Sequence, residues 1–405
     1  MNRLAFLLIL AIVAPIQPTD PDLVARARGI HERVITIDTH NDIEPVHFTP
    51  SCNYSMRLTT RVNLPKMRDG GLDVSFLVVY VAQPDAERVK DSFEPAGFAR
   101  AYRTAIERFD AIHRLTTELA PRDIELALTP DDVVRIAKTG KKVAVIGVEN
   151  GYPLGTDLGR VHEFWQRGAR YLSLAHNRHS HLADSNTGET DNRWAFGGLS
   201  PLGRQVVLEM NRLGIMVDIS HLSKGAAMQA IAVSRAPVIA SHSSARALAD
   251  HRRNLDDEQL AAVKTNGGVV QIVAFPSYLR VSPAGPGGQP ATPAPAAAKP
   301  RPCPVESPPA TPAAPPRASV RDLVDHIDYA VKRMGIDHVG ISSDFDGGGG
   351  IEGWNSAAET FNVTLELARR GYSEEQIGKI WSGNLLRVWR EAERVARESA
   401  GISIR

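Results

Sequence analysis

The sequence predicts an α/β protein, a single-domain (β/α)8 barrel of the TIM type, on three observations. Eight short apolar runs, rich in valine and isoleucine, recur along the 405 residues, and most are nearly continuous rather than alternating. Continuous runs are typical of parallel strands that are covered on both faces. Amphipathic segments with helix-start signals separate most of the runs, and ionisable residues stand at the ends of six of them. Eight alternations of strand and helix favour a parallel sheet that closes on itself.

The predicted strands follow one another without an internal sequence repeat. Helix N-caps are predicted at Thr129, Ser200 and Ser223, and proline follows the first two. The stretch 86–120 must hold one long helix or two shorter ones. An open doubly wound sheet is the alternative architecture, although eight strands are many for it. The predicted strands are residues 34–38, 74–81, 143–149, 171–176, 215–221, 237–242, 268–275 and 338–345.

One domain is predicted over residues 21–405, with helices after the last strand. Residues 282–319 interrupt it, because they hold 13 of the 27 prolines. Such composition buries too little apolar surface to offset the entropy of ordering. This Pro/Ala-rich insertion is therefore predicted to be a disordered loop before a helix beginning near Val320. A linker between two domains is the alternative, but a single further strand and its helices follow.

The first 20 residues predict a secretory signal peptide with an uncertain cleavage site. Arg3 precedes an apolar run that is too short to span a bilayer; a buried N-terminal helix is the alternative. The mature chain is thus expected to be exported, periplasmic or extracellular, without a transmembrane segment. Because Cys303, one of two cysteines with Cys52, falls in the proline-rich insertion, no disulfide essential to the fold is expected.

Charge is nearly balanced along the chain. There are 47 basic and 46 acidic residues, which give a formal net charge of +1, and no long run of one sign occurs. A nucleic-acid or membrane-surface partner is therefore not expected. The balance favours a small substrate.

Ionisable residues gather at the carboxyl ends of the predicted strands. In a (β/α)8 barrel these ends meet on one face, where active sites are assembled from several strands. Histidines and carboxylates without cysteine suit a divalent ion such as Zn²⁺, and five ligands suit two ions that share a carboxylate. Such a pair supports metal-assisted hydrolysis. The residues at these ends are His40, Asp42, Glu149, His176, His221, His242 and Asp344.

The remaining candidates receive more ordinary interpretations. Asp38 lies inside the first strand, which favours a role in orienting His40 or a neighbouring backbone group. Asp346 is expected to be a loop residue. Three histidines fall in loops near the expected rim, where they are within reach of a substrate: His47, His179 and His181. Four histidines in helical patterns are expected at the surface: His31, His113, His162 and His326.

These residues stand in motifs that resemble those of the membrane dipeptidase (renal dipeptidase) family of zinc peptidases. The motifs run in family order through nearly the whole mature chain. The family fold is a (β/α)8 barrel, which agrees with the strand count. The motifs are DTHND at 38–42, GVEN at 147–150, SLAHN at 173–177, DISHLS at 218–223, SHSSAR at 241–246, RRN at 252–254, SSDFDG at 342–347 and GNLLRVW at 383–389.

The resemblance implies a cofactor of two zinc ions per chain. His40 and Asp42 are expected to bind one ion, and His221 and His242 the other. Glu149 is expected to bridge the two ions, with a water or hydroxide completing the bridge.

The resemblance also implies contacts to a dipeptide substrate. His176 corresponds to the family histidine at the scissile carbonyl, where it is expected to stabilise the oxyanion. Arg253 matches the arginine that receives the terminal carboxylate, for which a guanidinium fork is well suited. Asp344 matches the acidic residue that holds the substrate ammonium or carries a proton to the leaving amine. With the bridging Glu149, His176 and Asp344 are the expected catalytic residues.

The implied activity is hydrolysis of free dipeptides, with tolerance of a D-residue at the C-terminal position and sometimes of β-lactam rings. The insertion at 282–319 departs from the family pattern, and the lipid-anchor signal of the animal members is missing. A homodimer, usual in the family, is compatible with the sequence. Two alternatives remain: another binuclear barrel hydrolase acting on lactones or cyclic amides, and a non-catalytic binding protein. Against the first, this chain has His-x-Asp rather than His-x-His on its first strand, and no lysine ends a predicted strand.

Overall fold

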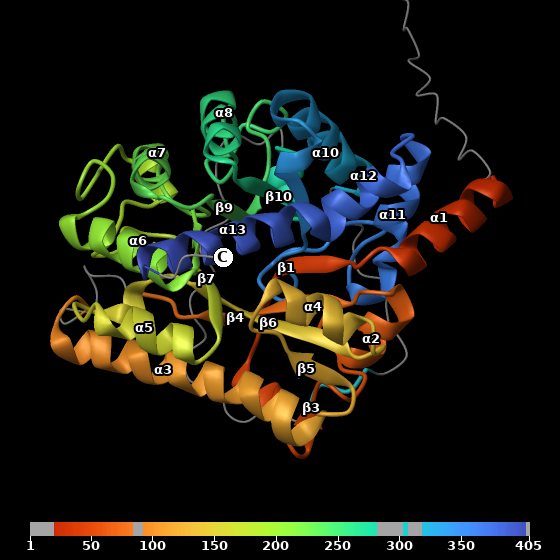
Figure 1. The fold of residues 1–405 in the computed structure, drawn as a ribbon, viewed down its shortest axis with the longest axis horizontal. Coiled ribbons are helices and arrows are strands. Elements are labelled where there is room, and N and C mark those ends of the chain that lie inside the picture. Colours follow the sequence, from red (N-terminus) through yellow and green to blue (C-terminus); the bar gives the residue numbers. More distant parts are fainter. Residues whose placement is uncertain (1–19, 84–91, 282–302, 307–317, 402–405) are drawn as a thin grey trace, which may run out of the picture.

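The computed structural model describes residues 20–83, 92–281, 303–306 and 318–401. The predicted signal peptide, apart from its last residue, and most of the predicted loop at 282–319 lie outside the described residues. The described chain forms a parallel barrel of eight strands with helices around it (Figure 1). The predicted (β/α)8 barrel is confirmed.

All eight predicted strands are present, and each lies beside the next one along the chain. The ring closes where the backbone N–H of Asp42 donates to the carbonyl oxygen of Phe345 at 2.9 Å. Because the strands run in one direction, their carboxyl ends share one face. In order around the barrel they are β1 (Ile37–Asp42), β4 (Val74–Tyr80), β6 (Lys142–Glu149), β7 (Ala169–Ser173), β8 (Met216–Asp218), β9 (Ile239–Ser243), β10 (Val269–Val273) and β11 (Val339–Ser342).

Three short strands were not predicted from the sequence. β5 (Ile124–Leu126) pairs in parallel with the start of β6. β2 (Phe48–Thr49) and β3 (Cys52–Asn53) form a small hairpin directly after β1. With two or three residues each, these strands are too short to show a hydrophobic pattern.

Helices cover the outside of the barrel. The predicted N-caps form, since the hydroxyls of Thr129, Ser200 and Ser223 each accept a backbone N–H at 3.0 Å. No helix of the described chain is long and apolar enough to traverse a bilayer. The helices are α1 (Pro21–Arg33), α2 (Leu64–Gly70), α3 (Pro95–Arg114), α4 (Pro130–Ala137), α5 (Gly159–Gln166), α6 (Pro201–Leu213), α7 (Lys224–Val233), α8 (Asp257–Asn266), α9 (Pro276–Leu279), α10 (Val320–Met334), α11 (Phe361–Arg369), α12 (Glu374–Gly378) and α13 (Asn384–Ser399).

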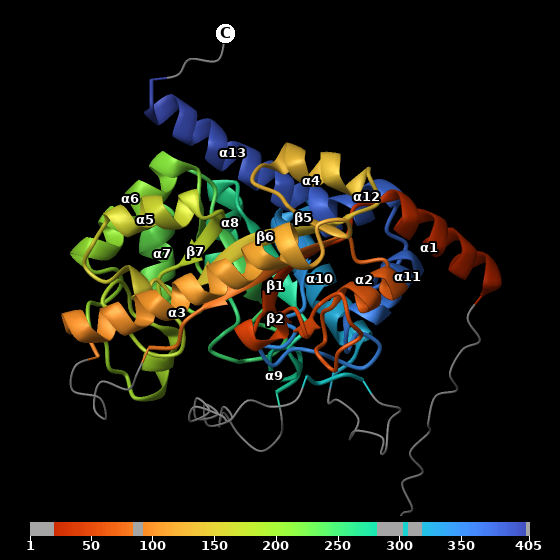
Figure 2. The same cartoon turned by 90° about the horizontal axis from the view of Figure 1, so that it is seen from below.

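The amino-end face of the barrel is closed by α13. Leu385, Leu386 and Trp389 of this helix join the apolar cluster that contains Phe76 and Tyr171 from the strands. The ring centroids of Phe76 and Trp389 are 6.4 Å apart. Figure 2 shows α13 at one end of the barrel, with α9 and β2 at the opposite end. This apolar plug leaves the carboxyl-end face for polar side chains.

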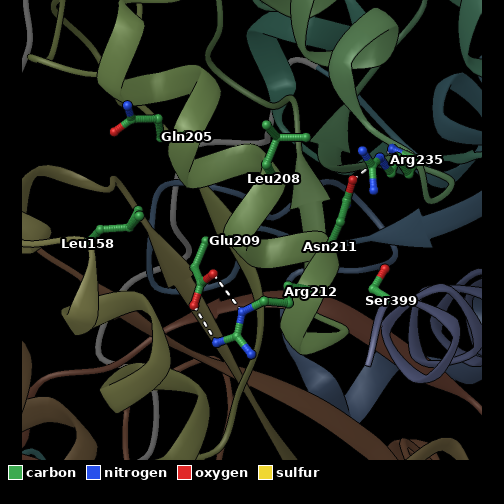
Figure 3. Close-up of a pocket in the computed structure, with 8 residues that line it drawn as sticks. All are labelled: Leu158, Gln205, Leu208, Glu209, Asn211, Arg212, Arg235 and Ser399. Carbon is green, nitrogen blue, oxygen red and sulfur yellow. Dashed lines mark hydrogen bonds and ion pairs between the residues drawn. The ribbon is translucent and has the colours of Figure 1, made fainter. Parts of the chain in front are cut away.

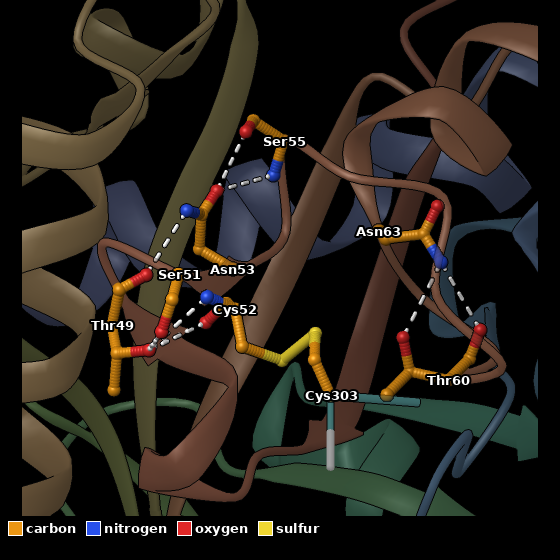
Figure 4. The surroundings of a disulfide bond; sticks show 8 residues. All are labelled: Thr49, Ser51, Cys52, Asn53, Ser55, Thr60, Asn63 and Cys303. Atoms are coloured by element: carbon orange, nitrogen blue, oxygen red, sulfur yellow. Dashed lines mark hydrogen bonds between the residues drawn. A yellow bond between two sulfur atoms is a disulfide. The ribbon is translucent and has the colours of Figure 1, made fainter. Parts of the chain in front are cut away.

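A disulfide joins Cys52 to Cys303 (Figure 4), a bond that the position of Cys303 in the proline-rich insertion did not predict. The bond anchors the described part of the insertion, residues 303–306, beside the β2–β3 hairpin. There the N–H of Thr59 donates to the carbonyl oxygen of Pro304 at 2.7 Å, and the N–H of Glu306 donates to that of Arg57 at 3.0 Å. The amino-acid composition is similar along the whole insertion, so it gave no sign that residues 303–306 pack against the hairpin.

Two of the histidines predicted at the surface are buried instead, so that prediction is wrong for them. His31 lies between α2 and α11, where Nδ1 is 2.7 Å from the Thr364 hydroxyl and Nε2 is 2.9 Å from the Gly70 carbonyl oxygen. Nδ1 of His326 accepts the backbone N–H of Ala245 at 3.1 Å. Both imidazoles are buried because the packed fold supplies their hydrogen bonds, which a helical sequence pattern does not reveal.

We expect the double variant Cys52→Ser, Cys303→Ser to lose about 2–5 kcal/mol of unfolding free energy, because the bond spans 251 residues and restricts the unfolded chain. Urea unfolding followed by circular dichroism measures the change. Reductant should lower the stability of the wild type to that of the variant and leave the variant unaffected. Equal unfolding midpoints without reductant would contradict the expectation.

Candidate active site

The side chains predicted at the strand ends converge at one place. Among the described residues, His40, Glu149 and His242 offer ligand atoms that all lie within 4.8 Å of one another, and Glu149, His176 and His221 do the same. Glu149 belongs to both groups, so the five side chains form one cluster around its carboxylate. All except the half-buried His176 are buried.

The carboxylate of Glu149 presents its two oxygens to different imidazoles. Oε1 lies 2.9 Å from Nε2 of His221 and 3.3 Å from Nε2 of His242, whereas Oε2 lies 3.6 Å from Nε2 of His40. Nε2 of His176 is 3.8 Å from Oε1. All four histidines therefore direct the same nitrogen towards one carboxylate, an arrangement that suits a carboxylate shared between metal ions.

Two further carboxylates lie beside this cluster. A Cβ on Gly347 would stand 2.3 Å from Oδ1 of Asp344 and 2.7 Å from Oδ2 of Asp42, so both side chains approach this glycine. Oδ1 of Asp42 is buried and has no hydrogen-bond partner among the described residues. A buried carboxylate oxygen without a donor is unfavourable. A divalent metal ion would supply the partner that this oxygen lacks, because all the ligand atoms around it are nitrogen and oxygen.

The backbone turns sharply where two of these residues leave their strands. His221 follows β8 with φ 68°, and Asp344 follows β11 with φ 57°. Residues other than glycine rarely adopt this left-handed conformation, and where they do it is often at functional sites.

Tyr171 fixes the imidazole of His40. Its hydroxyl donates to the carbonyl oxygen of Thr39 at 3.1 Å and lies 2.9 Å from Nδ1 of His40, so it accepts the Nδ1 proton. In the neutral imidazole Nε2 is then free of a proton and available as a ligand. The tyrosine ring requires Gly147, because a Cβ there would stand 2.1 Å from Cζ of Tyr171.

His242 and His221 are oriented by the same principle. Nδ1 of His242 is 2.8 Å from the hydroxyl of Ser241, which in turn donates to the carboxylate of Asp218 at 2.6 Å. Nδ1 of His221 is 3.2 Å from Oδ1 of Asn177. Each Nδ1 thus faces an acceptor, which leaves each Nε2 lone pair directed into the cluster.

His176 has a different partner. It stands three residues past β7, with Nδ1 3.2 Å from the hydroxyl of Tyr80 and the two ring centroids 4.6 Å apart. Burial lowers the pKa of His176 to about 4. The imidazole is therefore neutral at neutral pH, where it can donate one hydrogen bond without carrying a charge.

Burial controls the protonation of the acidic groups. It raises the pKa of Asp42 to about 7 and the pKa of Asp344 well above its usual range. Burial also opposes the charge on Glu149, but the imidazoles around it, His176 and His40 first among them, hold the pKa of Glu149 well below its usual range. Burial opposes the charge on His40 as well, yet Glu149 raises the pKa of His40 to about 9.

Arg253 lies beside the cluster with part of its guanidinium unused. Nη2 donates to the carbonyl oxygen of His242 at 2.9 Å, and the guanidinium carbon is 5.4 Å from the ring centroid of Tyr278. The residue is 4% exposed, and its Nε has no hydrogen-bond partner among the described residues. A buried guanidinium with a spare donor is well suited to receive an anionic ligand.

The other polar candidates lie around the cluster rather than in it. Asp38 accepts the backbone N–H of Ser343 at 2.8 Å and lies 3.5 Å from that of His40, contacts that fit the predicted orienting role. Asp346, in the loop after β11, accepts the N–H of Arg61 at 2.9 Å. The three rim histidines, His47, His179 and His181, are absent from both ligand groups that the described residues form.

Apart from Asp38, the residues that orient the imidazoles were not identified from the sequence. Each is polar or aromatic within or next to a predicted strand, and Tyr80 is the last residue of β4. A tyrosine at a strand end could have been identified as a candidate, because the site was predicted at the strand ends. The missed residues are Tyr80, Tyr171, Asn177, Asp218 and Ser241.

A separate hollow of about 410 Å³ lies on the outside of the barrel, between α5, α6 and the end of α13 (Figure 3). Its lining includes Leu208 and the ion pair of Glu209 with Arg212, whose atoms are 2.6 Å apart. Its lining residues include none of the cluster, so no catalytic role is assigned to it.

A (β/α)8 barrel whose carboxyl-end face brings together histidines and carboxylates that could hold metal ions is typical of metal-dependent hydrolases. The model of the membrane dipeptidase family, peptidase family M19, matches residues 24–403. The chain belongs to this family and is a metallo-dipeptidase, which confirms the family predicted from the motifs.

Individual relatives agree with this assignment. The chain is 34% identical to dipeptidase tcpJ of Claviceps purpurea over 85% of this chain and 72% of that protein, and 30% identical to mouse dipeptidase 3 over 95% and 70%. The crystal structure of the probable dipeptidase PvdM from Pseudomonas aeruginosa superposes with a TM-score of 0.78 at 31% identity, covering 93% and 99%. A metallopeptidase from Rhodobacter sphaeroides, liganded with a phosphinate mimic of L-Ala-D-Ala, shares the fold with a TM-score of 0.69 at 24% identity, covering 89% and 99%.

We expect metal affinity to rise with pH between 6 and 8. Without metal, His40 holds a proton up to about pH 9 and Asp42 up to about pH 7, so a metal ion must displace these protons. The affinity should change about tenfold per pH unit for each displaced proton. Competition with a chromophoric chelator at pH 6, 7 and 8 measures this change. Asp42→Asn should flatten the profile below pH 7, and a pH-independent wild-type affinity would contradict the expectation.

Proposed function

We propose that this enzyme hydrolyses free dipeptides at a centre of two zinc ions bridged by Glu149, and that it accepts a D-residue at the C-terminal position. The observation that carries the proposal is a single buried carboxylate whose two oxygens face different imidazoles. His40 and Asp42 are the proposed ligands of one ion, and His221 and His242 those of the other. Nitrogen and oxygen ligands without sulfur are compatible with zinc.

The protein's contribution at this centre is to hold its ligands in place. When bound, such ions lower the pKa of water to about 7 and polarise a carbonyl group. The hydroxyls of Tyr171 and Ser241 hold Nδ1 of His40 and of His242, so that Nε2 of each ring is the nitrogen directed into the cluster and available to a bound ion. Because these contacts are buried, the ligands are arranged before a substrate arrives, which favours reaction.

Arg253 is proposed to limit the substrate to dipeptides. The guanidinium of Arg253 is hydrogen-bonded to the main-chain carbonyl of His242, so the distance from the guanidinium to the cluster is fixed. A substrate carboxylate bound to Arg253 must then follow closely after the scissile bond. A free carboxylate one residue beyond that bond is the feature that distinguishes a dipeptide from a longer peptide.

Two side chains are proposed to act on the substrate itself. His176, which is neutral, donates a hydrogen bond to the carbonyl oxygen as negative charge develops there. Asp344, close to Asp42, holds the substrate ammonium or passes a proton to the leaving amine. The raised pKa of Asp344, caused by burial, favours its carrying a proton at neutral pH.

We also propose that the protein works outside the cytoplasm after residues 1–20 are removed. The disulfide between Cys52 and Cys303 supports this location, because such bonds persist in oxidising compartments.

The deciding experiment is metal analysis of the purified protein together with a peptide panel. The panel contains L-Ala-L-Ala, L-Ala-D-Ala, the tripeptide L-Ala-L-Ala-L-Ala and L-Ala-L-Ala amide, with release of free amine as the readout. About two zinc ions per chain, cleavage of both dipeptides and little cleavage of the tripeptide or the amide are expected. Zinc without dipeptide cleavage would redirect the search to lactones and cyclic amides. Absence of metal from protein never exposed to chelator would refute the proposed centre.

We expect His176→Ala to lower kcat by roughly 10²–10³-fold, the range seen when an oxyanion hydrogen-bond donor is removed. Bound metal should stay at the wild-type level, because His176 is not a proposed ligand. Steady-state kinetics and metal analysis of the same preparation test both points. Loss of one metal ion in this variant would show that His176 is a ligand.

A further inference from the structure

The four imidazoles of the cluster fall into two kinds, which differ in the group that faces Nδ1 of the ring. In His40, His221 and His242, Nδ1 faces an oxygen that accepts its proton. The hydroxyl of Tyr171 is committed as a donor to a backbone carbonyl, and the hydroxyl of Ser241 to a carboxylate. In the neutral form that a bound metal ion requires, these imidazoles therefore carry the proton on Nδ1 and direct a lone pair at Nε2 into the cluster.

His176 belongs to the other kind. Its Nδ1 faces the hydroxyl of Tyr80 at 3.2 Å, and within the described chain this hydroxyl has no other hydrogen-bond acceptor. A phenol whose proton is not committed elsewhere donates it to the lone pair of a neutral imidazole. Nδ1 of His176 then carries no proton, and Nε2 carries one.

Strand pairing places Tyr80 where it can do this. β4 and β6 run in parallel with Tyr80 paired to Glu149, so the tyrosine is fixed beside the central carboxylate. Nε2 of His176 lies 3.8 Å from Oε1 of Glu149. Its N–H thus lies next to the reaction centre while the other ring nitrogen is held by Tyr80.

We propose that Tyr80 is a positioning residue that sets the tautomer of His176. By donating to Nδ1, it keeps the proton of His176 on Nε2, where it is available to the substrate's carbonyl oxygen. The same proton prevents Nε2 from binding metal, so His176 is a hydrogen-bond donor although its distances resemble those of a ligand. The inference rests on the proposed function, because it assigns Tyr80 a part in the same hydrolysis.

The test is Tyr80→Phe in the metal-loaded enzyme, which removes one hydroxyl and keeps the ring. We expect kcat to fall about 10–100-fold, the usual loss when the hydrogen-bond partner of an active-site group is removed. KM should stay within about twofold and the metal content should not change. Tyr102→Phe is the matched control, since it removes a tyrosine hydroxyl bonded to Glu163 on the outer helices and should leave the kinetics unchanged.

A direct view of the proton comes from nitrogen NMR of the zinc-loaded protein with labelled histidine. His176 is assigned by the loss of its signals in His176→Gln. We expect a protonated Nε2 and an unprotonated Nδ1 in the wild type, and a mixture of tautomers in Tyr80→Phe. This measurement decides the proposal even when Tyr80→Phe proves unstable in a thermal melt.

Three results would overturn the proposal. A raised KM with unchanged kcat would make Tyr80 a substrate contact, and loss of metal in Tyr80→Phe would make its role structural. A proton on Nδ1 of His176 in the wild type would remove the basis of the inference. Failure of the proposed function is a separate result, since wild-type protein that cleaves no dipeptide leaves the tautomer measurement intact.

Discussion

The structure depends on a single buried charge, the carboxylate of Glu149. A carboxylate without partners is strongly disfavoured away from water, so it must be surrounded by groups that stabilise it. Four imidazoles reach it from β1, β9 and the turns after β7 and β8. Strand order is therefore tied to chemistry, because the strands on both sides of the barrel deliver imidazoles to this one carboxylate. The apolar plug formed by α13 closes the opposite end of the barrel.

Below the cluster, the barrel interior contains hydroxyl and carboxyl groups instead of apolar side chains. Ser241 and Asp218 support His242, while Ser343 and Asp38 join β11 to β1. Buried polar groups that lack some of their hydrogen-bond partners destabilise a fold, so these contacts must form together. The apolar half of the barrel, continuous with α13, provides the compensating burial. Stability and reactivity are thus assigned to opposite ends of the same strands.

The sequence was most informative where the signal was local or repeated. Continuous apolar runs revealed the eight strands, and parallel strands must bring residues such as Glu149 and His242 to one face. Partners brought together by folding were missed. Composition gave no sign that Cys303 would dock against a hairpin 251 residues away, or that the fold would bury His31 and His326. Tyr80 was missed because only acidic residues and histidines were selected at the strand ends, whereas the effect of Tyr80 depends on the proton that its hydroxyl shares with His176.

The disulfide also changes the covalent topology of the chain from a line into a ring with two tails. Residues 52–303 form the ring, and β1 lies on one tail and β11 on the other. A single cut in the backbone of the ring opens it but leaves every residue covalently joined. A single cut between 304 and 317 instead separates β11, with Asp344, from the strands that carry the histidines. Cys303 therefore divides the insertion into two parts with different properties. Cleavage before Cys303 leaves one covalent molecule, whereas cleavage after it makes the active site a complex of two chains.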